Sequence, residues 1–220
     1  MVQEIIKKIE YLSGNYSEYD IFSDWIKACA IGISNTTDIV HGEIWKMREE
    51  QYLEIVKKHG KEVMLAFGDM TGMLALELER QMYDVLGTVY MGLGIGNKNT
   101  GQFFTPPHIS RLVSEVTIES QFSHFDENDQ IELNEPSCGG GGMIIAAAET
   151  LKNKGINYQR RLSVIAQDLD WKGVYMCYVQ LSILGIKAIV VQGDTLKEPY
   201  NTPYPKDRVF YTPAKKGMIL

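Results

Sequence analysis

The chain has 220 residues, of which 45% are hydrophobic and 23% are charged, and its formal net charge is −6. This composition suits one globular domain of good size, or a smaller domain with a helical appendage, and it argues against a disordered chain. Proteins that wrap nucleic acid by themselves usually carry a basic surface, so any DNA contact here would have to be local or supplied by a partner.

The cysteines and the apolar runs indicate in which compartment the protein is expected. The three cysteines, Cys29, Cys138 and Cys177, are far apart in the chain, which fits a reducing cytoplasm better than a disulfide framework. No Cys/His cluster indicates a metal site. The N-terminus has no signal-peptide core, and the most apolar run, residues 174–191, is better divided into a helix, a glycine stop and a strand than taken as a membrane span. We therefore expect a cytoplasmic protein without a membrane segment.

The first hundred residues are predicted to be all-helical. In "YDIFSDWIKACAIGI" the apolar residues recur at helical spacing, which indicates a helix with one buried stripe. Residues 43–59 read as a second helix that ends at Gly60, and residues 61–91 read as one or two more. The glycine-rich stretch "MGLGIGNKNTG" is expected to link this helical region, residues 1–100, to a second domain, residues 101–220.

Strands and helices alternate after residue 101. The segments "QIELNEP", "RLSVIAQD", "KAIVVQGD" and "DRVFY" read as strands, and residues 142–154 and 171–184 read as the helices between the first three. Alternation of this length is typical of parallel βαβ units. The predicted fold class is therefore α/β with a parallel sheet.

A run of four glycines, in "EPSCGGGGM", lies between the first predicted strand and its helix. In doubly wound sheets this turn is at the carboxyl end of the strand, where ligands bind. A junction that only needs positive φ would use one or two glycines, so four in a row favour a ligand site. The ligand is not a dinucleotide or a P-loop phosphate, because "GLGIGN" follows a helix and no Gly-Lys-Ser/Thr follows the glycines.

Acidic residues follow the next two strands. Asp168 and Asp170 end the second strand, and Asp194 ends the third. An acid at the end of the second strand can accept hydrogen bonds from ribose hydroxyls, and an acid at the end of the third strand can accept one from an adenine amino group. The alternative for either is a helix N-cap. Together with the glycine-rich turn after the first strand, the two acids predict a site that binds a nucleoside but not a pyrophosphate.

Four segments in this order, "GQFFTP", "EPSCGGGGM", "AQDLD" and "GDTL", resemble the adenine-N6 DNA methyltransferases. The likeness is greatest to modification subunits of type I restriction systems and to small relatives in phages and mobile elements. It implies a class I S-adenosylmethionine (SAM)-dependent methyltransferase fold with a Rossmann-like parallel sheet, short at the C-terminus and preceded by a helical region. It also implies SAM as cofactor, DNA as partner, directly or through a specificity protein, and assembly as a homo-oligomer or restriction-modification subunit.

The resemblance assigns a role to each cofactor residue by position. The turn at Thr105 and Pro106, expected to be the N-cap and first residue of a helix, would hold the methionine carboxylate, and Glu135 would face the ammonium group. Asp168 would hold the ribose, Leu169 would pack on the adenine, and Asp194 would hold the adenine amino group. The remaining cofactor-binding residues are Ser137, Cys138, Gly139, Gly140, Gly141 and Thr195. Relatives often have Asp at the position of Glu135 and Glu at the position of Asp168, so both differences preserve the charge.

The family's catalytic tetrapeptide, Asn/Asp-Pro-Pro-Tyr/Phe, is missing. The favoured counterpart is "YTPA", with Tyr211, Thr212 and Pro213, because it follows a predicted strand. The alternative is "NTPY", whose candidate residues are Asn201, Pro203 and Tyr204. Two hypotheses follow: an adenine-specific DNA methyltransferase with an altered catalytic motif, or an inactive methyltransferase-like protein that interacts with or mimics a host restriction-modification subunit.

Overall fold

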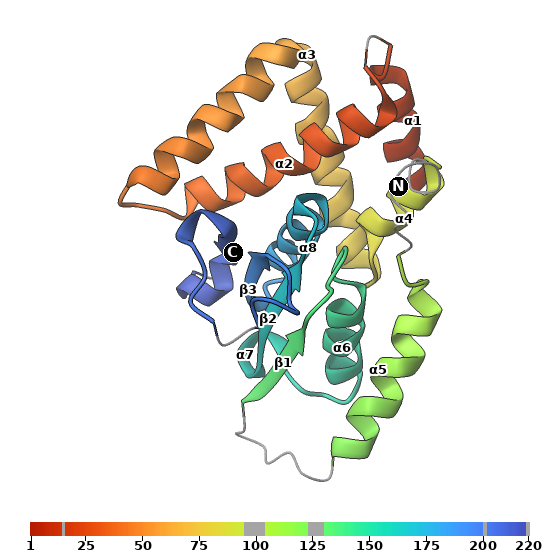
Figure 1. Cartoon of the computed structure of the whole chain (residues 1–220). Helices are drawn as coiled ribbons and strands as arrows, with labels where there is room; N and C mark the ends of the chain where they lie inside the picture. Colours follow the sequence, from red (N-terminus) through yellow and green to blue (C-terminus); the bar gives the residue numbers. More distant parts are fainter. Residues whose placement is uncertain (15, 95–103, 123–129, 200–201, 219–220) are drawn as a thin grey trace.

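A group of helices stands beside a small sheet in the computed structural model of the chain (Figure 1). The structure describes residues 1–220 except 15, 95–103, 123–129, 200–201 and 219–220. The N-terminal helices are α1 (Val2–Leu12), α2 (Glu18–Thr36), α3 (Glu43–Arg80) and α4 (Val85–Gly92). They are followed by α5 (Pro107–Phe122), β1 (Ile131–Glu135), α6 (Gly142–Asn153), α7 (Tyr158–Arg161), β2 (Leu162–Asp168), α8 (Trp171–Ile183), β3 (Lys187–Gln192), the 3₁₀ turn η1 (Lys206–Arg208), β4 (Val209–Tyr211) and the 3₁₀ turn η2 (Pro213–Lys216).

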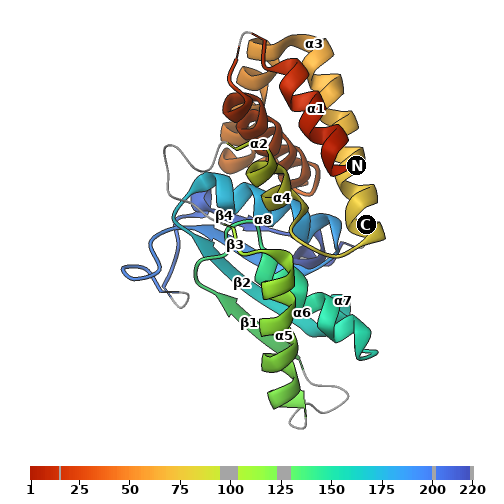
Figure 2. The ribbon, with the colours of Figure 1, turned by 90° about the vertical axis from the view of Figure 1, so that its right-hand side faces the viewer.

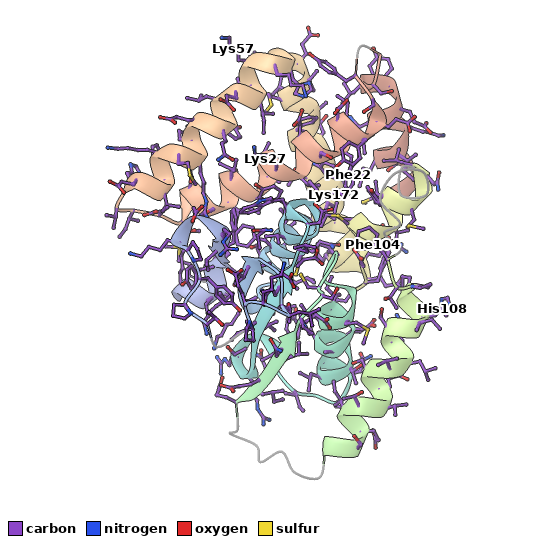
Figure 3. All side chains as sticks on the ribbon, viewed as in Figure 1. Phe22, Lys27, Lys57, Phe104, His108 and Lys172 are labelled. Atoms are coloured by element: carbon purple, nitrogen blue, oxygen red, sulfur yellow. The ribbon has the colours of Figure 1, made fainter. Side chains whose placement is uncertain are left out.

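The N-terminal helices begin and end at the residues that their local chemistry favours. Ser17 and Asp20 form a reciprocal capping box at the start of α2, and the helix buries Phe22 (labelled in Figure 3) and Trp25 completely. Gly60, with φ of 74°, interrupts α3 at a kink. A residue with a Cβ rarely adopts this conformation, so the predicted helix end at Gly60 is confirmed.

The first three strands form the predicted parallel βαβ units. The strand order is β1-β2-β3-β4, and β1–β2 and β2–β3 are parallel pairs. Both crossovers step in the same direction along the sheet, and right-handed connections of this kind place their helices on the same face. Accordingly α6 packs on β1, and α8 packs on β2 and β3 (Figure 2).

The fourth strand differs from the prediction, because β4 runs antiparallel to β3. Val209 pairs with Val191 and Tyr211 pairs with Ile189. A parallel neighbour needs a crossover that returns the chain to the other end of the sheet. The described part of the connection between β3 and β4 contains only η1, so the chain turns back instead. The sheet is therefore mixed, and the expectation of a wholly parallel sheet is wrong for β4.

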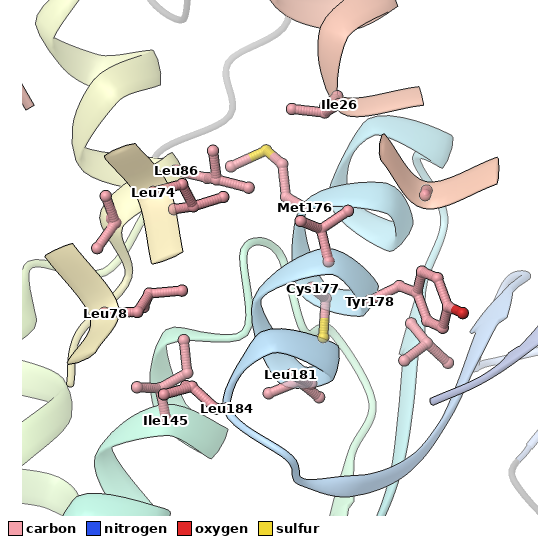
Figure 4. Packing of buried hydrophobic residues seen from close by; sticks show 14 of the residues in the cluster. Ile26, Leu74, Leu78, Leu86, Ile145, Met176, Cys177, Tyr178, Leu181 and Leu184 are labelled. Atoms are coloured by element: carbon pink, nitrogen blue, oxygen red, sulfur yellow. The ribbon is translucent and has the colours of Figure 1, made fainter. Parts of the chain in front are cut away.

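Helix α8 forms the centre of the molecule. It contacts α2 on one side and β2 and β3 on the other, and Met176, Cys177, Tyr178 and Leu181 are all buried (Figure 4). A helix that is apolar on every side is a core helix, which explains why residues 174–191 form the most apolar run of the chain. Among the described helices, none is both long enough and apolar enough to cross a membrane. One hydrophobic cluster extends from α1 to β4, across the predicted domain boundary at residue 100.

Candidate functional site

The segments that follow β1, β2 and β3 lie together at the carboxyl ends of these strands. The Gly139 amide donates a hydrogen bond of 2.8 Å to Oδ2 of Asp168. The Gly193 amide donates to the Asp168 carbonyl at 2.9 Å, and Oγ1 of Thr195 donates to the Pro136 carbonyl at 2.6 Å. These three bonds tie the glycine loop to both acidic segments. The structure therefore brings together the residues that the sequence placed at one edge of the sheet.

The glycine run is used largely for turning and for close packing. Gly139 and Gly141 have φ of 49° and 89°, in the left-handed region. A Cβ on Gly140 would lie 2.7 Å from Cγ of Asp84, closer than real Cβ contacts. The predicted turn is thus present, but the packing against Asp84 accounts for a further glycine without any ligand. The number of glycines alone therefore does not demonstrate a ligand site.

Asp84 and Gln180 hold the glycine loop from the helical side, and the sequence analysis missed both. Asp84 caps α4 by accepting from the Gly87 amide at 2.7 Å, and Nε2 of Gln180 donates to Asp84 at 2.9 Å and to the Gly140 carbonyl at 2.7 Å. Both side chains are buried, and burial raises the pKa of Asp84. One available signal was Gln180 itself, a polar residue in a mostly apolar helix, since buried polar groups usually have a partner.

Glu135 and Asp168 place two carboxylates beside the glycine loop. Burial, and to a lesser extent the negative charge of Asp168, raises the pKa of Glu135, whose carboxylate accepts a weak bond of 3.3 Å from the exposed Ser137. Asp168 accepts from the amides of Gly139 and Asp170. The next residue in the loop, Cys138, is buried, and its amide bonds across to β2. Two nearby carboxylates favour a cation between them.

The loop after β3 is more exposed. Asp194 accepts from the Leu196 amide at 3.1 Å and from Nζ of Lys197 at 3.2 Å, and the bond from Lys197 lowers its pKa. Leu169, on the neighbouring loop, is 67% exposed, and Leu196 is 95% exposed. Two exposed leucines on adjacent loops offer apolar surface to a flat ring. Leu196 was missed in the sequence, where its signal was an apolar side chain directly after "GDT".

The alternative role of an acid as a helix cap holds for Asp170 and not for Asp168. Oδ1 of Asp170 accepts from the Lys172 amide at 3.0 Å, at the start of α8. Asp168 instead turns toward the glycine loop, as its bond with Gly139 shows. The second strand therefore ends in one acid that caps the next helix and one that faces the candidate site.

The segment before α5 lies against the glycine loop, and its helix starts one residue later than predicted. The Pro106 carbonyl accepts from the Ser110 amide at 3.1 Å, so Pro106, and not Thr105, is the N-cap residue. The reason is Pro107, because a residue before proline is disfavoured in helical conformation. Phe104, labelled in Figure 3, packs edge-on against Tyr90, and its ring is 3.2 Å from a Cβ placed on Gly139. Residues 101–103 of "GQFFTP" lie outside the described residues.

The favoured catalytic segment lies at the other end of the sheet. Because β4 is antiparallel, Tyr211 and Thr212 reach the amino end of β3, whereas the glycine loop is at the carboxyl ends. Thr212 is fully buried; its hydroxyl donates to the Ile186 carbonyl at 2.7 Å and accepts from the Ala188 amide at 2.9 Å. Pro213, which is also buried, begins η2. The structure does not bring this segment to the cofactor edge.

The alternative catalytic segment comes closer to the glycine loop. The Tyr204 hydroxyl donates to Oε1 of Gln167 at 3.2 Å, and the Gln167 carbonyl accepts from the Cys138 amide. Asn201 is outside the described residues. Pro203 and Tyr204 line a hollow of about 300 Å³ with Tyr211, against Ile165 and Ile189. These two isoleucines alternate along their strands with residues that are buried under α8, so the hollow is on the opposite face of the sheet. The described residues of the two candidate segments meet there, at Pro203, Tyr204 and Tyr211.

The donor set fits an organic cation with hydroxyl groups better than a metal ion. No group of three His, Cys, Asp or Glu side chains in the described part of the chain could hold a metal. The edge instead offers the carboxylates of Glu135, Asp168 and Asp194 and two exposed leucines. This set matches the ammonium, ribose and adenine groups of SAM in charge and polarity.

Comparison with known proteins identifies the family. The family model for N-6 DNA methylases matches residues 81–214. The chain belongs to the N-6 DNA methylase family. The methylase subunit of the type I restriction enzyme MjaIX of Methanocaldococcus jannaschii is 31% identical over 112 residues, which are 49% of this chain and 18% of that protein. The resemblance noted in the four sequence segments is thereby confirmed, and the chain spans less than a fifth of this curated relative.

One solved structure confirms the fold class. A protein described as a class I SAM-dependent methyltransferase of Listeria monocytogenes superposes with a TM-score of 0.52 and 12% identity, over 92% of this chain and 56% of that one. A methyltransferase subunit of a type I restriction-modification system of Streptococcus thermophilus gives a TM-score of 0.46 and 14% identity, over 93% and 41%. The family match begins at residue 81, so α4 and Asp84 belong to the family segment. The predicted boundary at residue 100 stays a prediction.

Proposed function

We propose that the chain binds SAM at the carboxyl ends of β1, β2 and β3 and serves methyl transfer to the N6 atom of adenine in DNA. The observation that carries this proposal is the bond of 2.8 Å between the Gly139 amide and Asp168, which joins the glycine loop to the acid of the second strand. Membership of the N-6 DNA methylase family supports the choice of cofactor and of target.

Each residue of the edge has a role that its environment suits. Glu135 would accept the ammonium group, Asp168 the ribose hydroxyls and Asp194 the adenine amino group. Leu169 and Leu196 would cover the faces of the adenine. Bound SAM would supply an electrophilic methyl group at this edge. The protein's part is to orient the cofactor and to exclude water from it.

The start of α5 would hold the methionine carboxylate. Pro106 caps a helix of 16 residues, and the first amides of a helix favour an anion. Phe104, just before it, contacts the glycine loop, so the helix start and the loop face the same region. Thr105, exposed in the structure, lies between them.

A second candidate function is SAM binding without turnover, in a protein that pairs with or imitates a restriction-modification subunit. The observation that favours it is the position of Thr212, whose hydroxyl is occupied by backbone groups of Ile186 and Ala188. A methyl acceptor needs a polar group that orients the adenine amino nitrogen in line with the donor. The favoured segment lies at the amino end of β3 instead, and Asn201 of the alternative segment is outside the described residues.

Calorimetric titration of SAM tests the cofactor site. We expect binding by the wild-type chain and about 10- to 100-fold weaker binding by Asp168→Ala, because a lost buried partner costs about 1–3 kcal/mol. Asp69→Ala is the matched control, since Asp69 is exposed on α3 and pairs with Lys8. Absence of SAM binding, or equal weakening by both substitutions, would reject the site.

Transfer of a labelled methyl group to adenine-containing DNA separates the two functions. Transfer that Asp194→Ala slows at sub-saturating SAM supports the enzyme. SAM binding with no transfer, under conditions in which a known adenine methyltransferase is active, supports the binding protein. Transfer at the wild-type rate by Asp194→Ala at sub-saturating SAM contradicts the assignment of the adenine-binding acid.

A further inference from the structure

A second hollow, apart from the strand ends, lies between the N-terminal helices and α8. Its volume is about 410 Å³, and cationic and aromatic side chains make up most of its lining. The residues that matter are Lys27 of α2, Arg48 of α3, Trp171 and Tyr175 of α8, Phe210 of β4 and Asp207 of η1. Pockets for small molecules typically have volumes of about 300–1,000 Å³, so one nucleotide-sized group is within its capacity.

Arg48 is a buried cation without a carboxylate partner. It is 7% exposed, and its guanidinium carbon lies 3.8 Å from the centre of the Phe210 ring. Its Nη1 donates to Oγ of Ser34 and its Nη2 donates to the Val209 carbonyl, while its buried Nε has no hydrogen-bond partner. Within the described ranges no Asp or Glu lies at ion-pair distance from it. Burying a charge without a counter-charge is costly, so the arrangement favours an anion.

Lys172 is a second buried cation, and unlike Arg48 it has a carboxylate partner. This lysine, labelled in Figure 3, is also buried, and its Nζ lies over the aromatic rings of Tyr90 and Tyr19. Its Nζ, however, is 3.2 Å from a carboxylate oxygen of Asp170. The same protein thus pairs one buried cation with a carboxylate and leaves the other, at the hollow, without an acid at ion-pair distance among the described residues.

The rest of the lining suits a planar group with a negative charge. Trp171 and Tyr175, both half-buried, stack with ring centres 5.4 Å apart and planes 26° apart. Lys27 adds a second positive charge, and Asp207, which is exposed, is the one acid in this lining. Aromatic side chains bind nucleobases by stacking, and Arg and Lys bind phosphate.

We propose that this hollow binds a nucleotide, with its base on Trp171 and Tyr175 and its phosphate at Arg48 and Lys27. The nucleotide could belong to a DNA strand or be a free mononucleotide; DNA as the source rests on the proposed function. The hollow is next to the cofactor edge without being part of it, because Trp171 follows Asp168 by three positions. The site would hold a nucleotide of the strand outside the reacting position.

Two probes distinguish the sources: deoxyadenosine monophosphate by calorimetry, and a labelled single-stranded DNA of about 12 nucleotides by fluorescence anisotropy. Trp171→Leu is expected to weaken binding by about 10-fold, as loss of one stacked base does. Lys27→Gln is expected to weaken it by about 3-fold and to reduce the salt dependence by about one phosphate contact. Lys57 is an exposed lysine of α3, outside the hollow (Figure 3), and Lys57→Gln removes the same charge. This control should change neither the affinity nor its salt dependence.

The outcomes are separable. A strand that binds more than about 10-fold tighter than the mononucleotide identifies DNA, and equal affinity identifies a free nucleotide. No binding of either probe, or binding that Lys27→Gln and Trp171→Leu change no more than Lys57→Gln does, overturns the proposal. Thermal unfolding of each variant shows whether it is folded. SAM titration on the same samples keeps the two proposals apart, because either ligand can bind when the other does not.

Discussion

The two ends of the sheet differ in how completely their polar groups are satisfied. At the carboxyl ends of β1 to β3, Glu135 is partly buried with a raised pKa and accepts a single weak bond from Ser137. At the amino end of β3, the Thr212 hydroxyl both donates to and accepts from the backbone. A polar group with unused hydrogen-bond acceptors can bind a ligand, whereas a group whose hydrogen bonds are all made within the protein stabilises the fold. This difference supports the proposed ligand site at the first end and a structural role for Thr212 at the second.

The largest expected effect is from Gly140→Ala, which tests how the glycine loop is held. A methyl group there would lie 2.7 Å from Cγ of Asp84, and Asp84 cannot move without losing its bonds to Gly87 and Gln180. We expect a loss of about 2–4 kcal/mol in the free energy of unfolding, measured by urea denaturation.

Gly72→Ala is the matched control for this substitution. Gly72 lies in α3, and no atom would be within 4 Å of an added Cβ. Alanine should therefore raise stability by up to about 1 kcal/mol. If Gly140→Ala is tolerated as well as Gly72→Ala, the loop does not pack on Asp84 as described.

Thr212→Val tests the other end of the sheet. Valine has a similar shape but leaves the buried Ala188 amide without the side-chain oxygen that it bonds at 2.9 Å. Stability should fall by about 1–3 kcal/mol in urea denaturation, and SAM affinity should stay within about 2-fold in calorimetry. A folded variant of wild-type stability that has lost methyl transfer would instead make Thr212 a catalytic residue, as the sequence analysis favoured.

Glu135→Gln tests whether Glu135 lowers the stability of the folded protein while it contributes to ligand binding. Because the folded-state pKa of Glu135 is raised, the folded protein binds its proton more tightly than the unfolded chain does. Its contribution to the free energy of unfolding therefore falls as pH rises from the ordinary value of 4.5 through the raised pKa. At neutral pH the glutamine variant should be more stable, by less than about 1 kcal/mol because the group is only partly buried.

The same variant should bind SAM more weakly, because an amide cannot neutralise an ammonium group. Urea denaturation and calorimetry at a series of pH values measure both effects. In the wild type, SAM affinity should decrease as pH falls through the raised pKa, and Glu135→Gln should remove this dependence. Parallel losses of stability and affinity at neutral pH would contradict the idea that Glu135 is held for the ligand.

The strand ends could be predicted because they depend on local pattern and simple topology. Apolar runs of strand length, separated by helices of the right length, require parallel strands whose carboxyl ends meet. That reasoning placed Glu135, Asp168 and Asp194 at one edge. It also recognised the turn at the four glycines, and the cofactor-binding role that it gave to Gly139, Gly140 and Gly141 stays a prediction.

Contacts distant in sequence could not be predicted in this way. Asp84 and Gln180 are 96 positions apart, and no local pattern pairs them. The direction of β4 depends on how the chain returns after β3, which "DRVFY" does not encode by itself. The cap of α5 moved by one residue because two prolines in a row constrain each other, which the general preference for Thr as a cap does not include.

The smallest effect is expected from Asp194→Asn, which compares two acids of the same edge. Lys197 lowers the pKa of Asp194, so this carboxylate stays ionised where Glu135 begins to take up a proton. Asp194 is half-buried, and its partner Lys197 is exposed, so the ion pair is at the surface and thermal unfolding should not shift measurably. Asparagine keeps an oxygen that can accept from the adenine amino group, so SAM affinity should fall by less than about 3-fold, whereas Asp194→Leu should reduce it by about 10-fold. Equal losses from both substitutions would mean that the charge of Asp194, and not its acceptor oxygen, contributes to binding.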